Sequence, residues 1–233
     1  MSSAVERAKL RAARRAVEFV EDGMVLGAGS GSTAKLFLRE LAERARASEL
    51  EIVVIPTSID TEMLARQLGL RVEHPNSGLR PDLAVDGADV VDRDLNLLKG
   101  GGGALAREKV VDYYSERFIV VVDWTKLAGT LYVRPVPVEV MPFAWRPVAE
   151  ELERVVPCRV ELRMCGKGKV GPVVSDNGNF ILDVYVEERD LPCTKLDEEI
   201  RALPGVVETG IFPCDMVDAV VIGYPDRVEV LER

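Results

Sequence analysis

The chain has 233 residues, of which 47% are hydrophobic and 30% charged, with a formal net charge of −9 at pH 7. This length allows one large domain, or a principal domain carrying a smaller one. The acidic balance argues against general nucleic-acid binding, which needs a basic surface to displace counterions from phosphate. No apolar run approaches the roughly 18–20 residues that span a bilayer, and residues 1–20 lack the apolar core of a signal peptide. We therefore predict a cytoplasmic protein whose partners include neither a membrane nor a nucleic acid.

Strands and helices are predicted to alternate along the first half of the chain. Residues 5–20 have the apolar spacing of an amphipathic helix, and residues 24–26 form a strand that runs into the glycine-rich segment 27–33. Further helices are predicted at 34–46, 60–68 and 104–114, and further strands at 51–56, 70–74, 82–85 and 118–122. This order predicts an α/β fold with a doubly wound, mostly parallel, Rossmann-like sheet. Ligands of such sheets bind at the carboxyl ends of the strands.

The composition changes near residue 132, where four prolines fall within 13 residues, at 135, 137, 142 and 147. Helices are predicted at 148–155 and 196–203, and strands at 159–164, 173–174 and 180–186 around the turn 176–179. We predict a small α+β domain, ferredoxin-like in class, over residues 132–207. The apolar strand 218–223 then rejoins the first sheet, so the catalytic domain comprises residues 1–131 and 208–233.

The glycine-rich segment after the first strand is a candidate anion site. Its backbone amides and the positive end of the following helix can hold a phosphate, and the residues concerned are Ser30, Gly31, Ser32 and Thr33. A Rossmann fingerprint needs a third glycine where Ser32 stands, and a P-loop needs Gly-Lys-Ser/Thr, so nucleotide binding is disfavoured. Two readings stay open at this point, a structural glycine turn and a cradle for a phosphate or sugar.

Carboxylates and a lysine follow at the ends of later predicted elements. Asp86, Gly87, Ala88 and Asp89 come directly after a buried strand, although Asp-Gly is also a common turn. Lys99 precedes four glycines, including Gly100, Gly101 and Gly102, which let the backbone approach a ligand. Glu108 lies in the first turns of the next helix.

A carboxylate base, aspartates and a lysine are the groups needed to move a proton between adjacent carbons of an aldose and a ketose. That reaction requires no metal and no organic cofactor. The sequence supplies no zinc pattern either, because His74 is the only histidine and the four cysteines lack CxxC spacing. We read these cysteines as reduced or buried small apolar residues, while disulfides among them stay open.

Several of these segments, in this order and spacing, resemble the ribose-5-phosphate isomerase A family. The resemblance covers nearly the whole chain and includes 29–34, 86–89, 98–102, 107–109, 135–140, 175–179, 203–207 and 222–223. Members with Thr at the position of Ser30 are common, and the segment 127–134 is more divergent. Neither departure removes a catalytic group.

The resemblance implies interconversion of D-ribose 5-phosphate and D-ribulose 5-phosphate through an enediolate, in the non-oxidative pentose phosphate pathway. Glu108 would be the proton-shuttling base. Asp86 and Asp89 would bind sugar hydroxyls and assist ring opening, and Lys99 would stabilise the developing oxyanion. The loop residues from Ser30 to Thr33 and from Gly100 to Gly102 would contact substrate, with Gly87 and Ala88 beside the aspartates. Lys126 matches a lysine expected near the phosphate.

Two other functions are weighed against the isomerase. A sugar-phosphate sensor would bind without turnover, but such regulators commonly carry a DNA-binding helix-turn-helix, for which the first 20 residues are too short. Deamination or lactone hydrolysis of a phosphosugar would more naturally use a histidine, and His74 falls on a predicted strand away from the motif loops. The family resemblance also implies a homodimer or a homotetramer.

Overall fold

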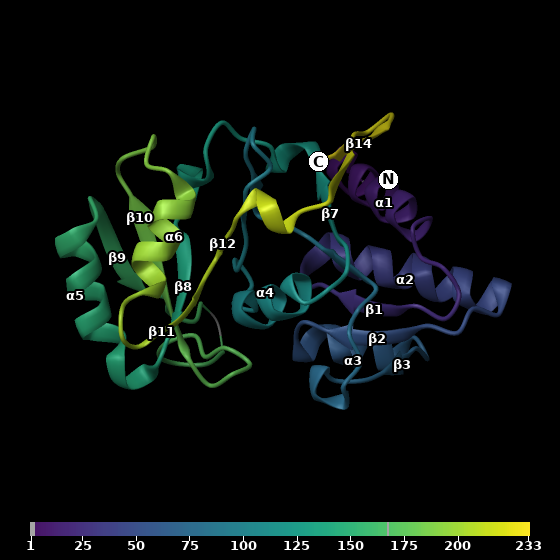
Figure 1. Ribbon diagram of the computed structural model, residues 1–233, viewed down its shortest axis with the longest axis horizontal. Coiled ribbons are helices and arrows are strands. Elements are labelled where there is room, and N and C mark those ends of the chain that lie inside the picture. The colour runs from purple at the N-terminus through teal and green to yellow at the C-terminus, as the bar shows by residue number, and fades with distance from the viewer. Residues whose placement is uncertain (1–2, 167) are drawn as a thin grey trace. The chain divides into compact units, whose positions relative to one another are not determined.

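A seven-stranded sheet forms the centre of the first of two compact units in the computed structural model, which describes residues 3–166 and 168–233 (Figure 1). The first unit comprises the residues up to Ala88, Arg107–Lys126 and Asp215–Arg233. Its helices and strands are α1 (Ala4–Val17), β1 (Val25–Ala28), α2 (Gly31–Ser48), β2 (Val53–Pro56), α3 (Ile59–Gln67), β3 (Arg71–Val72), β4 (Leu83–Asp86), α4 (Leu105–Tyr113), β7 (Phe118–Asp123), β13 (Ala219–Gly223) and β14 (Val228–Glu232).

The strand order of this sheet is β14-β13-β7-β4-β1-β2-β3, and every pair is parallel except β13 with β14. The chain therefore builds outward from β1 in both directions, through β2 and β3 on one side and through β4 and β7 on the other. The prediction of a doubly wound, mostly parallel sheet is confirmed, as is the return of strand 218–223 to it. The order in which successive strands are added to the sheet reverses between β1 and β4, and ligands of such sheets bind at this switch point.

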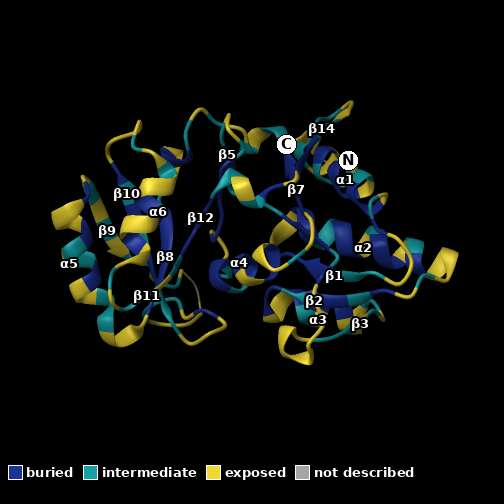
Figure 2. Cartoon of the chain, in the orientation of Figure 1, coloured by how far each residue is buried: buried dark blue, intermediate teal, exposed yellow. Residues whose placement is uncertain are grey.

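Successive residues of β1 face opposite sides of the sheet, and their contacts show which helices cover each side. Leu26 and Ala28 of β1 belong to a core cluster with Ala12 of α1 and Phe37 of α2. Gly27, between them, faces the other way, and a Cβ there would lie 2.7 Å from Cγ1 of Val111 on α4. The inner strands β4, β7 and β13 are buried along their length, as Figure 2 shows for β7, whereas the edge strands β3 and β14 are partly exposed. Within the described residues, no helix is long and apolar enough to cross a membrane.

The second unit comprises Asp89–Ala106 and Leu127–Cys214. Its main sheet has the strand order β11-β8-β10-β9, with every pair antiparallel. In chain order the elements read β-α-β-β-α-β, which is the ferredoxin-like arrangement and confirms the predicted class. They are β8 (Val136–Val140), α5 (Trp145–Val155), β9 (Cys158–Leu162), β10 (Phe180–Val186), α6 (Cys193–Arg201) and β11 (Val206–Thr209).

A small three-stranded sheet in the same unit carries the glycine-rich segment after Lys99. Its order is β12-β6-β5, all antiparallel. The strands are β5 (Val90–Val91), β6 (Leu97–Leu98) and β12 (Ile211–Phe212). None of these strands, nor β8, β11 or β14, was expected from the sequence.

Several expected elements differ from the observed ones. Helix α2 begins at Gly31, three residues earlier than predicted, and β3 spans only two residues. His74 therefore lies outside that strand and precedes a 3-10 turn, Pro75–Ser77, because Pro75 cannot donate to a strand ladder. The predicted strand 173–174 is reduced to an isolated bridge between Val174 and Phe180.

The two compact units also differ from the predicted domains. Residues 89–106, assigned above to the catalytic domain, group with the second unit. A compact unit need not fold independently, so the domain boundaries stay a prediction. The chain crosses between the units at four points: residues 88–89, 106–107, 126–127 and 214–215.

Candidate active site

The glycine-rich loop after β1 and the aspartate that ends β4 lie together at the switch point of the large sheet. Asp86 is fully buried, and its Oδ1 accepts the backbone N–H of Ser30 at 3.0 Å and that of Gly87 at 2.6 Å. The N–H of Gly29 donates to the carbonyl of Val85 at 2.9 Å. A Cβ on Gly29 would lie 2.0 Å from Cγ of Asp86, so only glycine lets the loop approach the carboxylate this closely.

The helix that follows this loop presents an open amino terminus. Ser30 is the N-cap residue of α2, and its side chain makes no capping hydrogen bond. Gly31 has a φ of +89°, a conformation that favours glycine. Gly31 and Ser32 are exposed and Thr33 is buried. The amino terminus of such a helix favours an anion, and an anion at this loop stays a prediction.

The hydroxyl of Ser30 lies in a cluster of hydroxyls that sequence analysis missed. Its Oγ lies 2.9 Å from Oγ1 of Thr57 and 2.8 Å from Oγ of Ser58. Thr61 Oγ1 donates to the carbonyl of Gly29 at 2.9 Å, which ties this cluster to the loop. The signal was available, because Thr57 and Ser58 follow β2, and β2 pairs in parallel with β1. The carboxyl ends of both strands meet at one edge.

Lys9 brings a cation to the same loop. Its Nζ donates to Oγ of Ser32 at 2.9 Å, although the two residues are 23 positions apart. Lys9 lies on α1, which packs against α2. Nothing in the sequence around Lys9 marks it, because the contact exists only once these helices pack.

Glu108 lies in the first turn of α4, as predicted, and its side chain is buried with 6% of the residue exposed. The positive end of the helix favours a carboxylate there. Asp112, one turn further along the same face, is also buried and was not predicted.

Lys126 ends the 3-10 turn Trp124–Lys126 directly after β7, the strand next to β4. It thus lies at the same edge of the sheet as Asp86. Its half-buried side chain makes no hydrogen bond or ion pair with any other residue in the described part of the chain.

Asp89 and Lys99 belong to the second unit, where they flank one loop. Oδ2 of Asp89 accepts the backbone N–H of Gly101 at 2.7 Å. Lys99 follows β6 directly and is 2% exposed, and its Nζ lies 5.3 Å from the ring centroid of Phe212. Gly100 is buried with a φ of +93°, whereas Gly101 and Gly102 are exposed.

The predicted site residues divide between the two compact units. The first unit holds Ser30, Gly31, Ser32, Thr33, Asp86, Gly87, Ala88, Glu108 and Lys126, and the second holds Asp89, Lys99, Gly100, Gly101 and Gly102. The peptide bond from Ala88 to Asp89 joins the groups covalently.

The cysteines form no disulfide, and all four are partly buried free thiols. They are less buried than the small apolar residues we expected. Burial raises the pKa of the Cys158 and Cys193 thiols to about 11 in each case. Among residues 3–166 and 168–233, no three His, Cys, Asp or Glu side chains are grouped so that they could hold a metal ion.

Comparison with known proteins agrees with this fold. The family model of ribose 5-phosphate isomerase A (phosphoriboisomerase A) matches residues 53–227. Ribose-5-phosphate isomerase A of Thermococcus kodakarensis is 46% identical over 98% of this chain and 99% of its own length. That of Thermomicrobium roseum is 47% identical over 98% of this chain and 94% of its own.

Solved structures give the same result at the level of the fold. Ribose 5-phosphate isomerase A from Methanocaldococcus jannaschii superposes with a TM-score of 0.92 at 43% identity, covering 98% of this chain and 99% of that one. A D-ribose-5-phosphate isomerase in complex with phospho-erythronic acid gives a TM-score of 0.94 at 42% identity, covering 99% and 100%. The chain belongs to the ribose 5-phosphate isomerase A family.

Proposed function

We propose that this chain interconverts D-ribose 5-phosphate and D-ribulose 5-phosphate through an enediolate, with Glu108 as the proton-transferring base. The single observation that carries the proposal is a buried carboxylate in the first turn of α4, in a chain whose family is defined by this isomerisation. The reaction takes a proton from C2 of the aldose and delivers one to C1 of the ketose. A positioned carboxylate can perform both transfers.

Asp86, Asp89 and Lys99 supply the polar groups around the reacting carbons in this proposal. The two carboxylates accept hydrogen bonds from sugar hydroxyls and assist ring opening. The Lys99 ammonium stabilises the negative charge that develops on the enediolate oxygen. The fixed orientation of Asp86, set by the amides of Ser30 and Gly87, supports a role in positioning.

The phosphate of the substrate is assigned to the amino terminus of α2. The backbone amides from Gly31 to Thr33 at the start of α2, with Lys126 at the same sheet edge, support this assignment. Lys9 extends it, because its amine already contacts Ser32. The backbone from Gly100 to Gly102, with Gly87 and Ala88, would contact the sugar.

The test is isomerisation of D-ribose 5-phosphate in the presence of EDTA by the native chain and by Glu108→Gln, which keeps the shape of the side chain and removes the base. We expect turnover to survive EDTA, and kcat to fall by about 100-fold or more in the variant. Glu116→Gln is the matched control, since Glu116 is exposed just beyond α4 and the charge change is the same.

The outcomes separate the two parts of the proposal. A native protein that binds ribose 5-phosphate without converting it would be a sensor and not an enzyme. A fully active Glu108→Gln would leave the family assignment in place and remove Glu108 from the mechanism.

We further infer a cytoplasmic homodimer or homotetramer. Large apolar side chains on the surface support a subunit interface, since monomers rarely expose contiguous apolar patches of more than a few hundred Å². Phe143 in the second unit is 94% exposed, and Tyr113 in the first is 65% exposed. Sedimentation equilibrium of the native chain and of Phe143→Ser would test whether the second unit carries such an interface.

A further inference from the structure

The loop that follows Lys99 is held by side chains of its own unit from two directions. On one side the N–H of Gly101 donates to Asp89. On the other, Nη1 of Arg163 donates to the carbonyl of Gly100 at 2.8 Å and to that of Gly101 at 3.3 Å. Glycines have the widest backbone freedom of any residue, so such a loop depends on external contacts for a single conformation.

Arg163 is itself fixed by a second partner. It follows β9, and its Nε donates to Oδ2 of Asp183 on β10 at 2.9 Å, while Nη2 pairs with Oδ1 of the same carboxylate. Both side chains are largely buried, 17% and 15% exposed. A bidentate arginine–carboxylate pair has a defined geometry, which leaves Nη1 directed at the loop. Most other ion pairs among the described residues are far more exposed.

We propose that Arg163, oriented by Asp183, is a positioning residue that holds the loop 99–103 in the conformation in which Lys99 and Asp89 act on the substrate. The proposal rests on the roles given above to those two residues. Arg163 touches neither reacting group. It acts through the carbonyls of Gly100 and Gly101. These two glycines follow Lys99 directly in the chain, and the N–H of Gly101 donates to Asp89.

The chemistry explains why arginine is needed at this place. A guanidinium has five donors in a planar fork, so it can serve the Asp183 carboxylate and two carbonyls at once. A lysine in its place could serve one partner well but not all of them. Loss of the contact would let Lys99 move from the oxygen on which charge develops, and a displacement of about 1 Å can lower a rate by 10²-fold.

The test compares Arg163→Met, Arg163→Lys and Arg163→Ala with a matched control. The control is Arg159→Met on β9, the strand that Arg163 follows, since Arg159 also pairs with a carboxylate, that of Glu161, but lies on the surface. For Arg163→Met we expect kcat to fall by about 10- to 100-fold with KM changed much less, because the phosphate contacts belong to the other unit. The control keeps its native kcat.

Chemical rescue separates positioning from structure. In Arg163→Ala, millimolar guanidinium chloride should restore part of kcat, while sodium chloride at the same concentration should not. Circular dichroism on each variant checks folding, and Arg163→Lys, expected to keep an intermediate kcat, serves if the smaller side chains do not fold. Native kcat in Arg163→Met, or a loss in every variant that guanidinium does not relieve, overturns the proposal.

Lys99→Met, measured in parallel, keeps the inference distinct from the site on which it rests. An active Lys99→Met removes the role of Lys99 and this inference with it. An inactive Lys99→Met beside a fully active Arg163→Met removes only the inference.

Discussion

The position of Asp86 depends on the absence of a side chain at Gly29. Gly29→Ala would place a Cβ 2.0 Å from both Cγ and Oδ1 of the carboxylate, and Asp86 is fully buried, with little room to move aside. We expect kcat/KM for ribose 5-phosphate to fall by about 100-fold, the loss that a displaced catalytic group produces. Gly129→Ala is the control, because nothing lies within 4 Å of the added Cβ. Equal activity of the two variants would contradict this account of Asp86.

At the same scale, burial keeps the Cys158 thiol protonated, with its pKa raised from 9.0 to about 11 mainly by loss of solvent and then by Glu153 and Glu187. The unfolded chain releases this proton first, so the thiol's contribution to stability is complete below pH 9 and is lost as the pH rises towards 11. Alkylation of Cys158 by iodoacetamide, followed by peptide mass spectrometry, should reach half its maximal rate near pH 11 in folded protein. In urea the midpoint should lie near 9, and identical midpoints would refute the shift.

Single residues also show how far sequence reasoning reaches. Glu108 was placed from its position in a predicted helix, whereas Lys126 was named only because it matches a lysine of the family. Glu139 was quoted only as part of a family motif. It is a buried carboxylate whose Oε1 accepts from Ser175, Asn177 and Asn179, and so it holds the hairpin turn 175–179. A motif can thus be structural, and only the contacts reveal which kind it is.

At the scale of elements, α1 depends on close contact with β13. A Cβ on Gly223 would lie 2.0 Å from the carbonyl oxygen of Ala8, which is backbone and cannot rotate away. We expect Gly223→Ala to lower the free energy of unfolding by about 2–3 kcal/mol, as overpacking does. Urea unfolding measures it, with Gly166→Ala as a control in open space. An unchanged midpoint would mean that α1 shifts without penalty.

The helices of the first unit and most strands of its parallel sheet were predicted, whereas β8 and the two-residue strands of the small sheet were not. Strand β8 was missed because Pro135, Pro137 and Pro142 read as a boundary. In the sheet Pro137 lies opposite Asp183 of β10, and its carbonyl accepts from Gly210. The strand therefore accommodates these prolines, and its pairing is set by residues that are distant in the sequence. Two-residue strands such as β5 and β6 have no periodicity to detect.

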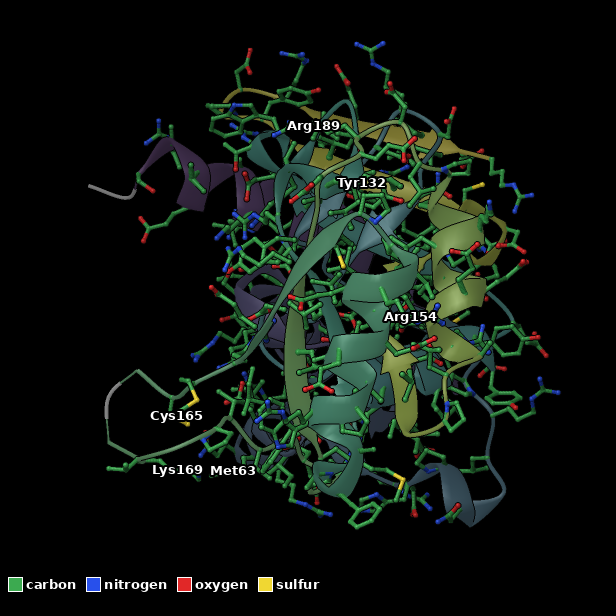
Figure 3. All side chains as sticks on the ribbon, turned by 90° about the vertical axis from the view of Figure 1, so that its left-hand side faces the viewer. Met63, Tyr132, Arg154, Cys165, Lys169 and Arg189 are labelled. Carbon is green, nitrogen blue, oxygen red and sulfur yellow. The ribbon has the colours of Figure 1, made fainter. Side chains whose placement is uncertain are left out.

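For the molecule as a whole, strand order decided where the site would be, and that order is only partly readable in one sequence. The alternation of elements predicted a doubly wound sheet with ligands at the carboxyl edge. The placement of β4 beside β1, which brings Asp86 to the loop at Ser30, required the tertiary structure. The ferredoxin-like unit was likewise predicted in class but not in register. Figure 3 shows Cys165 and Lys169 of this unit away from its helices.

The most direct test of the account follows the proton itself. Ribose 5-phosphate is converted by the native chain in D₂O, and the product is examined by NMR. Proton transfer through Glu108 predicts ribulose 5-phosphate with deuterium at C1 in at least part of the product, and almost no labelled product with Glu108→Gln. Ribulose 5-phosphate formed at the native rate without any deuterium, as direct hydride transfer would give, or equal labelling by Glu108→Gln, would contradict it.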